Sequence, residues 1–336
     1  MTKNIVVTGS AGFVGHHVVE YFLNKTDYNI IGIDSFRHKG DSLRLRHLYK
    51  HPRFRNYSHD LTTPISNRLI DEIGPVDYIL NIASESHVDR SLTDPVEFVR
   101  NNIMLALEMA EYARKVKPKM FLQMSTDEVF GSALPGQKHN EWDAHRPSNP
   151  YAASKAAQEN ILFSYWRSYN LPLVRTNTMN IFSLRQDPEK FIPMCISKIN
   201  KGETVTIHGS PGNIGSRMYL DARNLADAWL FLIKNVEPVL YSDNKEGLQE
   251  PMAFNIAGLE EIDNLYLATK IAEYVGKDLN YELVDFHKSR PGHDRAYRLD
   301  SSKIYALGWS QPVSTWESLK DVVLWTLDHN NKAWLK

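Results

Sequence analysis

Short apolar runs and amphipathic helical patterns alternate along the first half of the chain, from residue 3 to about residue 176. The runs are rich in β-branched and aliphatic residues, and they read NIVVTG, YNIIGID, FRNYSHD, VDYILNIA, KMFLQMST and LPLVRTN. Between two of these runs, Val99, Ile103, Leu107 and Ala110 stand at helical spacing within residues 96–116, which predicts an amphipathic helix. This alternation is typical of βαβ units and predicts a parallel sheet.

The alternation of apolar runs and helical patterns becomes less regular after residue 177. Shorter elements are separated by turn-forming residues, namely Pro188, Pro193, Gly209, Pro211, Gly212 and Gly215. A polar stretch, YSDNKEGLQEP, separates a predicted helix near residues 221–234 from a predicted strand, AFNIA. We therefore expect two regions, residues 1–177 and residues 178–336, with some chain crossing between them. The sequence shows no repeats, heptads or low-complexity tracts.

Charge and composition exclude several classes of protein. The 336 residues carry 39 basic and 40 acidic side chains, a net charge of -1, so no global basic field favours nucleic acid or an anionic membrane. No apolar run approaches the roughly 18 residues of a membrane span. The single cysteine, Cys195, lies in the apolar stretch FIPMCISKI and is expected to be a buried structural thiol. The N-terminus lacks the pattern of a signal peptide, so a cytoplasmic protein is expected.

The first predicted strand runs directly into TGSAGFVG, which supplies Gly9, Gly12 and Gly15 before a helical pattern. Glycines here allow a tight turn, let backbone N–H groups approach a pyrophosphate, and let the helix pack on the strand. A merely tight turn between strand and helix is the alternative. In this context the motif predicts a dinucleotide site, and hence a Rossmann-type, doubly wound parallel sheet with a smaller C-terminal α/β lobe for the substrate. Phe13 and Val14, within the motif, are expected at the cofactor.

Two acids follow the next strands. Asp34 ends the second strand, where a carboxylate can accept both hydroxyls of the adenosine ribose, which favours NAD over NADP. Arg37 and His38 beside it weaken that preference. Asp60 ends the third strand and could either meet the adenine or cap the following helix. The further positions expected at the cofactor are Leu61, Ala83 and Ser84.

Tyr151 and Lys155 stand four residues apart in NPYAASKA, so on a helix they share one face. A lysine cation near a phenol favours the phenolate, which makes the tyrosine a usable base. The alternative is a surface tyrosine beside a surface lysine. Asn149 and Pro150 suit the start of a helix, and the preceding strand end supplies the hydroxyl of Thr126. Together with NAD, these residues predict oxidation of an alcohol.

Asp127 and Glu128, in MSTDEVFG, are not needed for hydride transfer, so they indicate a further reaction step. A ketone acidifies the neighbouring C–H bond, so one carboxylate can remove that proton while a carboxylic acid protonates a departing β-hydroxyl. Two close carboxyl groups tend to have different pKa values, because the charge of one disfavours ionisation of the other. One group can then act as an acid while the other acts as a base. The pair therefore predicts elimination of water, the alternative being that one acid caps the following loop.

With these residues in view, the chain resembles the extended short-chain dehydrogenase/reductase family and, within it, the nucleotide-sugar 4,6-dehydratases, most closely those acting on dTDP-glucose. The matching segments are VTGSAGFVG, ASESHVDRS, STDEVFG, NPYAASKA, PEKFIP and RPGHDRAYRLD. The resemblance implies Tyr151 as the base with Lys155 and Thr126, Asp127 as the acid toward the sugar 6-hydroxyl, and Glu128 as the base at C5. It also implies bound NAD, a nucleotide-diphosphate sugar as substrate, and a homodimer through helices near residues 96–116 and 151–169. An epimerase or decarboxylase, or an NAD-sensing regulator, are the alternatives.

The same resemblance implies a set of substrate contacts. In ASESHVDRS, the residues Ser84, Glu85, His87 and Arg90 match positions that line the cofactor and substrate cleft, although Arg90 could equally be a structural ion-pair partner. Ser86, His87 and Arg90 are expected to contact the substrate. Asn180 is kept, but the residues after it, Ile181 to Leu184, depart from the usual NNYGP, and the segment Ser216 to Tyr219 departs from the usual RDWLYV. The nucleobase and the sugar therefore stay open. The candidates for the diphosphate are Arg217, Arg290 and His293. No histidine spacing predicts a metal site.

Overall fold

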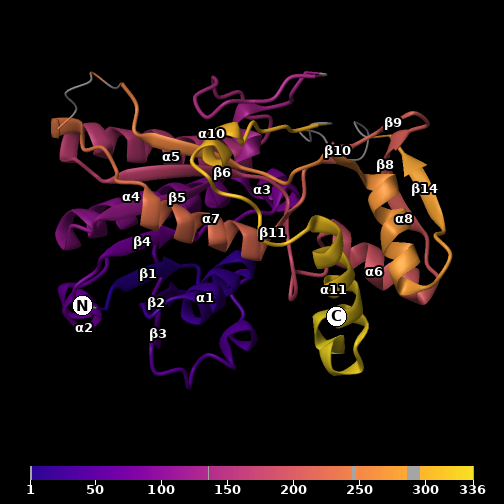
Figure 1. Cartoon of the computed structure of the whole chain (residues 1–336), viewed down its shortest axis with the longest axis horizontal. Coiled ribbons are helices and arrows are strands. Elements are labelled where there is room, and N and C mark those ends of the chain that lie inside the picture. Colours follow the sequence, from indigo (N-terminus) through magenta and orange to yellow (C-terminus); the bar gives the residue numbers. More distant parts are fainter. Residues whose placement is uncertain (1, 135, 244–246, 248, 286–295, 336) are drawn as a thin grey trace.

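The computed structural model describes residues 2–335 except 135, 244–246, 248 and 286–295. All six predicted runs form parallel strands, which a seventh strand joins from the second half of the chain, in the order β12-β6-β5-β4-β1-β2-β3 (Figure 1). These strands are β1 (Asn4–Thr8), β2 (Asn29–Asp34), β3 (Phe54–Ser58), β4 (Tyr78–Asn81), β5 (Met120–Thr126), β6 (Leu173–Thr178) and β12 (Met252–Ile256). The α/β prediction with a Rossmann-type sheet is confirmed.

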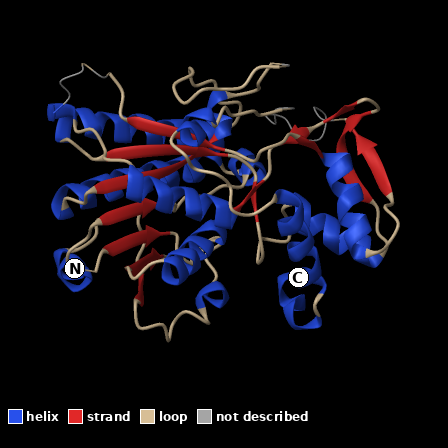
Figure 2. Cartoon of the chain, viewed as in Figure 1, coloured by secondary structure: helices blue, strands red, loops and turns tan. Residues whose placement is uncertain are grey.

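Helices cover both faces of this sheet (Figure 2). Because side chains alternate along a strand, Ile5 and Val7 face α1 and α7 on one side, whereas Val6 faces α2, α4 and α5 on the other. The helices and turns of these layers are α1 (Phe13–Lys25), η1 (Ser42–Leu45), α2 (Asn67–Ile73), α3 (Val88–Thr93), α4 (Pro95–Val116), η2 (Asp127–Phe130), α5 (Pro150–Tyr169), α7 (Ala222–Asn235), η3 (Tyr241–Asp243) and α10 (Ser302–Ala306).

A smaller lobe lies beside the sheet and contains a three-stranded sheet in the order β14-β8-β9 (Figure 1). Its core packs Ile196 and Ile199 against Leu267, Ile271 and Leu319. The elements of this part of the chain are β7 (Ile181–Phe182), α6 (Phe191–Lys201), β8 (Val205–Ser210), β9 (Asn213–Ile214), β10 (Ser216–Arg217), β11 (Leu220–Asp221), β13 (Ile262–Asp263), α8 (Asn264–Val275), β14 (Tyr281–Val284), α11 (Thr315–Leu327) and η4 (His329–Leu335).

The helix predicted over residues 96–116 is present as α4, but its buried face differs from the predicted one. Phe98, Leu105 and Met109 are buried, whereas Val99 and Ile103 are only partly covered. The reason is that α4 packs on the sheet and α5 together, and the spacing of apolar residues alone does not reveal which of two apolar rows faces the neighbours.

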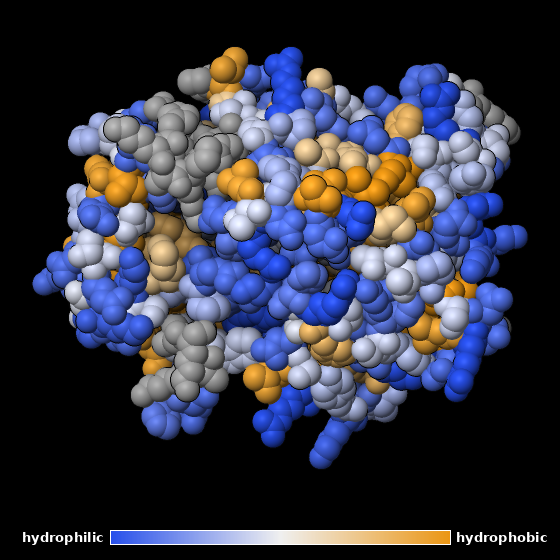
Figure 3. All heavy atoms as spheres, turned by 180° about the vertical axis from the view of Figure 1, so that it is seen from behind, coloured by the Kyte–Doolittle hydropathy of each residue, from blue (hydrophilic) through white to orange (hydrophobic). Residues whose placement is uncertain are grey.

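Two further features concern the predictions about the single cysteine and about membrane-spanning helices. Cys195 is buried, as expected, and burial raises the pKa of its thiol to about 12. No helix in the described ranges is long and apolar enough to cross a membrane. Seen from behind, the surface is mainly hydrophilic, with hydrophobic residues in small groups and one short band (Figure 3).

Candidate active site

Two adjoining cavities open at the carboxyl ends of the parallel strands, where ligands bind in open α/β sheets. The first lies over the glycine turn, and the second lies between the end of β5 and the smaller lobe. Tyr151, Met124 and Ser125 line both cavities. A ligand in the first cavity would therefore meet a ligand in the second at Tyr151.

Every residue predicted at the cofactor lines the first cavity. These residues are Gly9, Gly12, Phe13, Val14, Gly15, Asp34, Asp60, Leu61, Ala83, Ser84, Tyr151 and Lys155. The strand order places the ends of β1, β2 and β4 side by side, and this arrangement brings together residues as far apart in the chain as Gly9 and Ser84.

The glycine turn is closely packed. Gly9 has a φ of 66°, in the left-handed region that favours glycine, and its carbonyl accepts from the Gly12 N–H at 2.9 Å. A Cβ atom on Gly15 would lie 1.9 Å from the Gly9 carbonyl oxygen. Helix α1 begins at Phe13 with Gly12 at its N-cap and no side-chain cap. The turn thus leaves the helix N-terminus open to a phosphate group.

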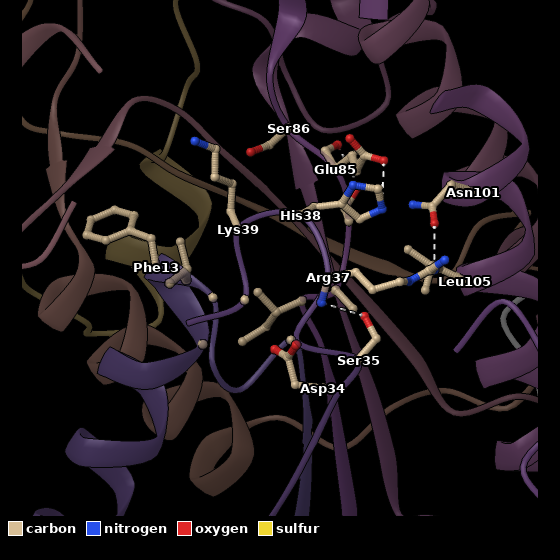
Figure 4. Close-up of a pocket in the computed structure, with 18 of the residues that line it drawn as sticks. Phe13, Asp34, Ser35, Arg37, His38, Lys39, Glu85, Ser86, Asn101 and Leu105 are labelled. Carbon is tan, nitrogen blue, oxygen red and sulfur yellow. Dashed lines mark hydrogen bonds and ion pairs between the residues drawn. The ribbon is translucent and has the colours of Figure 1, made fainter. Parts of the chain in front are cut away.

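Asp34 is buried, and its carboxylate accepts from the backbone N–H groups of Ala11 and Phe36 at 2.9 and 2.8 Å. Burial raises its pKa, and these two hydrogen bonds oppose the rise. Asp34 therefore stands at the position predicted for the ribose contact and also ties β2 to the glycine turn. Figure 4 shows it below Arg37 at the wall of the cavity.

Asp60 does not cap the next helix, so that alternative is wrong. Helix α2 begins at Asn67 and is capped by Ser66. The Asp60 carboxylate accepts instead from Thr62 and forms an ion pair with Arg37 at 2.8 Å. Arg37 is therefore engaged within the cavity wall, where it also lies against Asn101 (Figure 4).

The acid pair lies where β5 ends. Thr126 is the last residue of the strand, and Asp127 and Glu128 open the short 3-10 turn η2. All three residues line the second cavity. The Thr126 hydroxyl donates to Asp127 Oδ1 at 2.9 Å. Asp127 is 4% exposed, and its Oδ2 has no hydrogen-bond partner among the described residues.

The surroundings of Asp127 favour its protonated form. Burial, followed by the nearby charge of Glu128, raises the pKa of Asp127 to about 7. Glu128 has a different environment, because its Oε2 accepts from Asn149 Nδ2 at 3.0 Å. The two adjacent carboxyl groups are thus unequal, as an acid and a base must be.

Tyr151 and Lys155 both lie on α5 and are buried, but their contacts differ from the predicted pairing. Lys155 Nζ donates to the Met124 carbonyl at 2.8 Å and to Gln158 Oε1 at 2.6 Å, and not to the phenol. Burial lowers the pKa of Lys155 to about 8, while Glu159 opposes this. The pKa of Tyr151 is raised, chiefly by burial and then by Glu128, and a hydrogen bond to Thr126 opposes the rise.

Most of the predicted substrate contacts line the second cavity, namely Ser86, His87, Asn180 and Arg217. Arg90 lines the first cavity instead and pairs with Glu85 at 3.3 Å, which favours the alternative of a structural ion pair. Arg290 and His293 lie outside the described residues. The Arg217 guanidinium lies 4.9 Å from the centre of the Tyr297 ring.

The second cavity also contains residues that the sequence analysis missed. They include His208, Asn264, Tyr297, Glu189 and Lys190. A signal existed for three of them, since Glu189 and Lys190 belong to the matching segment PEKFIP and Tyr297 belongs to RPGHDRAYRLD. His208 lies within β8 and Asn264 begins α8, and no local pattern marks them.

The comparisons with known proteins agree with this geometry. The family model described as GDP-mannose 4,6 dehydratase matches residues 6–322. The chain belongs to this family. It is 33% identical over 321 residues to a low-salt glycan biosynthesis protein, Agl12, of Haloferax volcanii, covering 95% of this chain and 97% of that one. It is 31% identical to a dTDP-glucose 4,6-dehydratase of Haemophilus influenzae, with 98% and 99% covered.

The fold comparison points the same way. The dTDP-glucose 4,6-dehydratase of Streptomyces venezuelae, solved with NAD bound, has a TM-score of 0.87 at 27% identity, with 99% of each chain covered. The predicted membership of the extended short-chain dehydrogenase/reductase family and its nucleotide-sugar 4,6-dehydratases is confirmed. The predicted enzyme class, an NAD-dependent hydro-lyase, is confirmed at the level of this family.

Within the part of the chain that the structure describes, one group of side chains has metal-binding geometry. His16, His17 and Glu20 place ligand atoms within 4.8 Å of one another on α1. Arg185, however, donates to both oxygens of Glu20 at 3.2 Å, and a guanidinium at the carboxylate opposes a cation there. This cluster therefore carries no metal assignment.

Proposed function

We propose that the chain converts a nucleotide-diphosphate hexose, with dTDP-glucose as the first candidate, into its 4-keto-6-deoxy product, and that NAD is its bound and recycled cofactor. The observation that carries this proposal is the unequal acid pair, Asp127 and Glu128, in the cavity that adjoins the cofactor cavity at Tyr151. Two of the proteins named above are dTDP-glucose 4,6-dehydratases, which supports the choice of substrate.

The residues divide the reaction into oxidation and elimination. Tyr151 accepts the proton of the sugar 4-hydroxyl, which Thr126 orients, and Lys155 lines the first cavity on the same helix as Tyr151. Bound NAD would supply the hydride chemistry at C4 and C6. Glu128 removes the C5 proton, and Asp127, protonated near neutral pH, gives its proton to the departing 6-hydroxyl. Glu128 then returns the proton to C5 as C6 is reduced. One water leaves, and the oxidation state of the cofactor is restored.

The positive side chains near the second cavity suit the diphosphate. We propose Arg217 and Lys190, which both line this cavity, as contacts for the phosphate oxygens. Ser86, His87 and Asn180 are proposed as sugar contacts. The residues assigned to catalysis and to the cofactor in the sequence analysis keep these roles as proposals.

We also propose a cytoplasmic homodimer that pairs through α4 and α5. The row formed by Val96, Val99, Ile103 and Leu107 supports this, since Val96 is 72% exposed and the other three are only partly covered. The division into a cofactor region, residues 1–177, and a mainly substrate-binding region, residues 178–336, is part of the same proposal.

The test is incubation with a panel of nucleotide sugars that differ in base and sugar, followed by mass spectrometry. The expected product has lost one water, and no NADH accumulates over many turnovers because the hydride is returned. Isomerisation without change of mass would favour an epimerase, and loss of carbon dioxide a decarboxylase. Stoichiometric build-up of NADH would favour a simple dehydrogenase, and NAD binding without turnover of any sugar a regulator.

A further inference from the structure

Asn149 connects two parts of the active site through a single amide group. It is the N-cap of α5, in extended conformation, and its Oδ1 accepts from the Ala152 N–H at 2.9 Å. Its Nδ2 donates to Glu128 Oε2 at 3.0 Å. Asn149 is 5% exposed, whereas Glu128 is partly exposed and lines the second cavity. The cap of the helix that carries Tyr151 therefore also holds the carboxylate of Glu128.

The contact favours the form of Glu128 that a base requires. A donated hydrogen bond stabilises a carboxylate more than a carboxylic acid. Among the described residues, the charge of Glu128 acts on the titration of Asp127 on η2, Tyr151 on α5 and Lys190 at the start of α6. Two of these are acids whose own ionisation the charge of Glu128 opposes. The amide of Asn149 cannot lose a proton at working pH, so it supports Glu128 without competing in proton transfer.

We infer that Asn149 is a positioning residue for the base Glu128. It fixes the direction of the Glu128 carboxylate toward the substrate C5 and holds it ionised, while its Oδ1 caps α5. This inference rests on the proposed function, in which Glu128 removes the C5 proton. The two roles of the Asn149 side chain can be tested separately. Serine and aspartate cap helices as well as asparagine does, but neither offers an amide donor.

Two matched variants test the separation. Asn149→Ser keeps a hydroxyl for the helix cap and is too short to replace the donated hydrogen bond to Glu128. Asn149→Asp keeps the cap oxygen and places a second carboxylate opposite Glu128, which penalises the ionised base. Each variant is compared with the parental protein and with Glu128→Gln in single-turnover reactions that follow bound NADH by absorbance and the dehydrated product by mass spectrometry.

Both variants are expected to keep the parental thermal midpoint and the parental rate of NADH formation. Dehydration should slow on the order of 10- to 100-fold in Asn149→Ser, the range for a lost hydrogen bond to a charged group. It should slow further in Asn149→Asp. The acidic limb of the pH–rate profile should move to higher pH in the order asparagine, serine, aspartate, because a less supported carboxylate holds its proton more tightly.

Three outcomes would overturn the inference. In the first, both Asn149 variants dehydrate the substrate at the parental rate with an unchanged pH profile, while Glu128→Gln is slow. This result would show that Asn149 is only a helix cap. A fall in thermal midpoint together with a fall in NADH formation would assign the loss to α5 and Tyr151. Parental dehydration in Glu128→Gln would remove the proposed role of Glu128, and this inference with it, which distinguishes that failure from the first.

Discussion

At the scale of single residues, the acid pair shows how neighbours assign different chemistry to two similar side chains. Asp127 is buried with one oxygen unpartnered among the described residues, and its pKa is raised to about 7. Glu128, next in the chain, receives a hydrogen bond from Asn149. Environment, and not residue type, therefore separates the acid from the base.

The first prediction separates the two half-reactions. Oxidation at C4 needs Tyr151 and Thr126, whereas elimination needs Glu128 and Asp127. Removing acid–base help costs about 10²–10⁴-fold in the step concerned. Glu128→Gln and Asp127→Asn should therefore form bound NADH in a single turnover while the dehydrated product falls sharply, as followed by absorbance and mass spectrometry. Tyr151→Phe, the control, should abolish both signals. Dehydration at the parental rate in both acid variants would make the pair structural.

The second prediction concerns pH. A carboxyl group whose pKa is raised to about 7 carries its proton below that pH and loses it as the pH rises. Because Asp127 acts as the acid, the dehydration rate should be highest just below about pH 7, above the acidic limb set by Glu128, and should fall about tenfold per pH unit well above pH 7. Single-turnover rates measured from about pH 5 to about pH 9 would show this limb. Asp127→Asn should be slow at all pH values and lack it.

Residue types and their order were predictable from the sequence, but their contacts were not. The motif YAASK identified Tyr151 and Lys155, yet the direction of the Lys155 ammonium depends on Gln158 and on the Met124 carbonyl, which come from the helix itself and from β5. Arg90 illustrates the same limit, because its partner Glu85 is five residues away on a turn whose shape no local pattern specifies.

At the scale of elements, the glycine turn was predictable from the spacing of Gly9, Gly12 and Gly15, because the close packing of the turn leaves no room for larger side chains. The structure places the Gly9 carbonyl against the first turn of α1. The buried face of α4 was not predictable, since two apolar rows run along the helix and only packing on α5 and the sheet selects one.

The third prediction tests this turn. A Cβ atom on Gly15 would lie 1.9 Å from the Gly9 carbonyl oxygen, so Gly15→Ala must shift α1 away from β1. NAD affinity, measured by calorimetry, should fall at least tenfold because the N–H groups of the turn move with the helix. Gly74→Ala is the control, since its added methyl meets nothing within 4 Å and only backbone strain of about 1–3 kcal/mol is expected. Equal NAD affinity in the two variants would contradict the steric account.

At the scale of the whole molecule, the chain does not keep its two halves apart. Strand β12 and helix α7 come from the second half, yet β12 pairs with β6 at the edge of the main sheet and α7 packs on α1. Local patterns predicted both elements but not where they pack in the fold. The pattern within a short segment does not indicate which strand it pairs with when the partner is more than 70 residues away.

The two halves also meet at the cofactor cavity through Arg44, a buried residue at η1. Its guanidinium donates to the Ala11 carbonyl beside the glycine turn and to the Lys39 carbonyl. It also donates to the Arg185 carbonyl and pairs with Asp187 at 3.1 Å, in the loop before α6. Asp187 lines the cofactor cavity, so Arg44 connects its two walls.

The last prediction follows from this connection. Arg44→Met fills similar space but removes all these donors, so the free energy of unfolding should fall by about 1.5–3 kcal/mol, the range for hydrogen bonds to charged groups. NAD affinity should fall with it, because the wall formed by the loop before α6 loses its attachment. Denaturant unfolding and calorimetry measure the two effects. Lys270→Met, which removes an exposed ion pair with Glu273 within α8, is the matched control and should change neither. Arg44→Met with parental NAD affinity would show that the loop holds its place without Arg44.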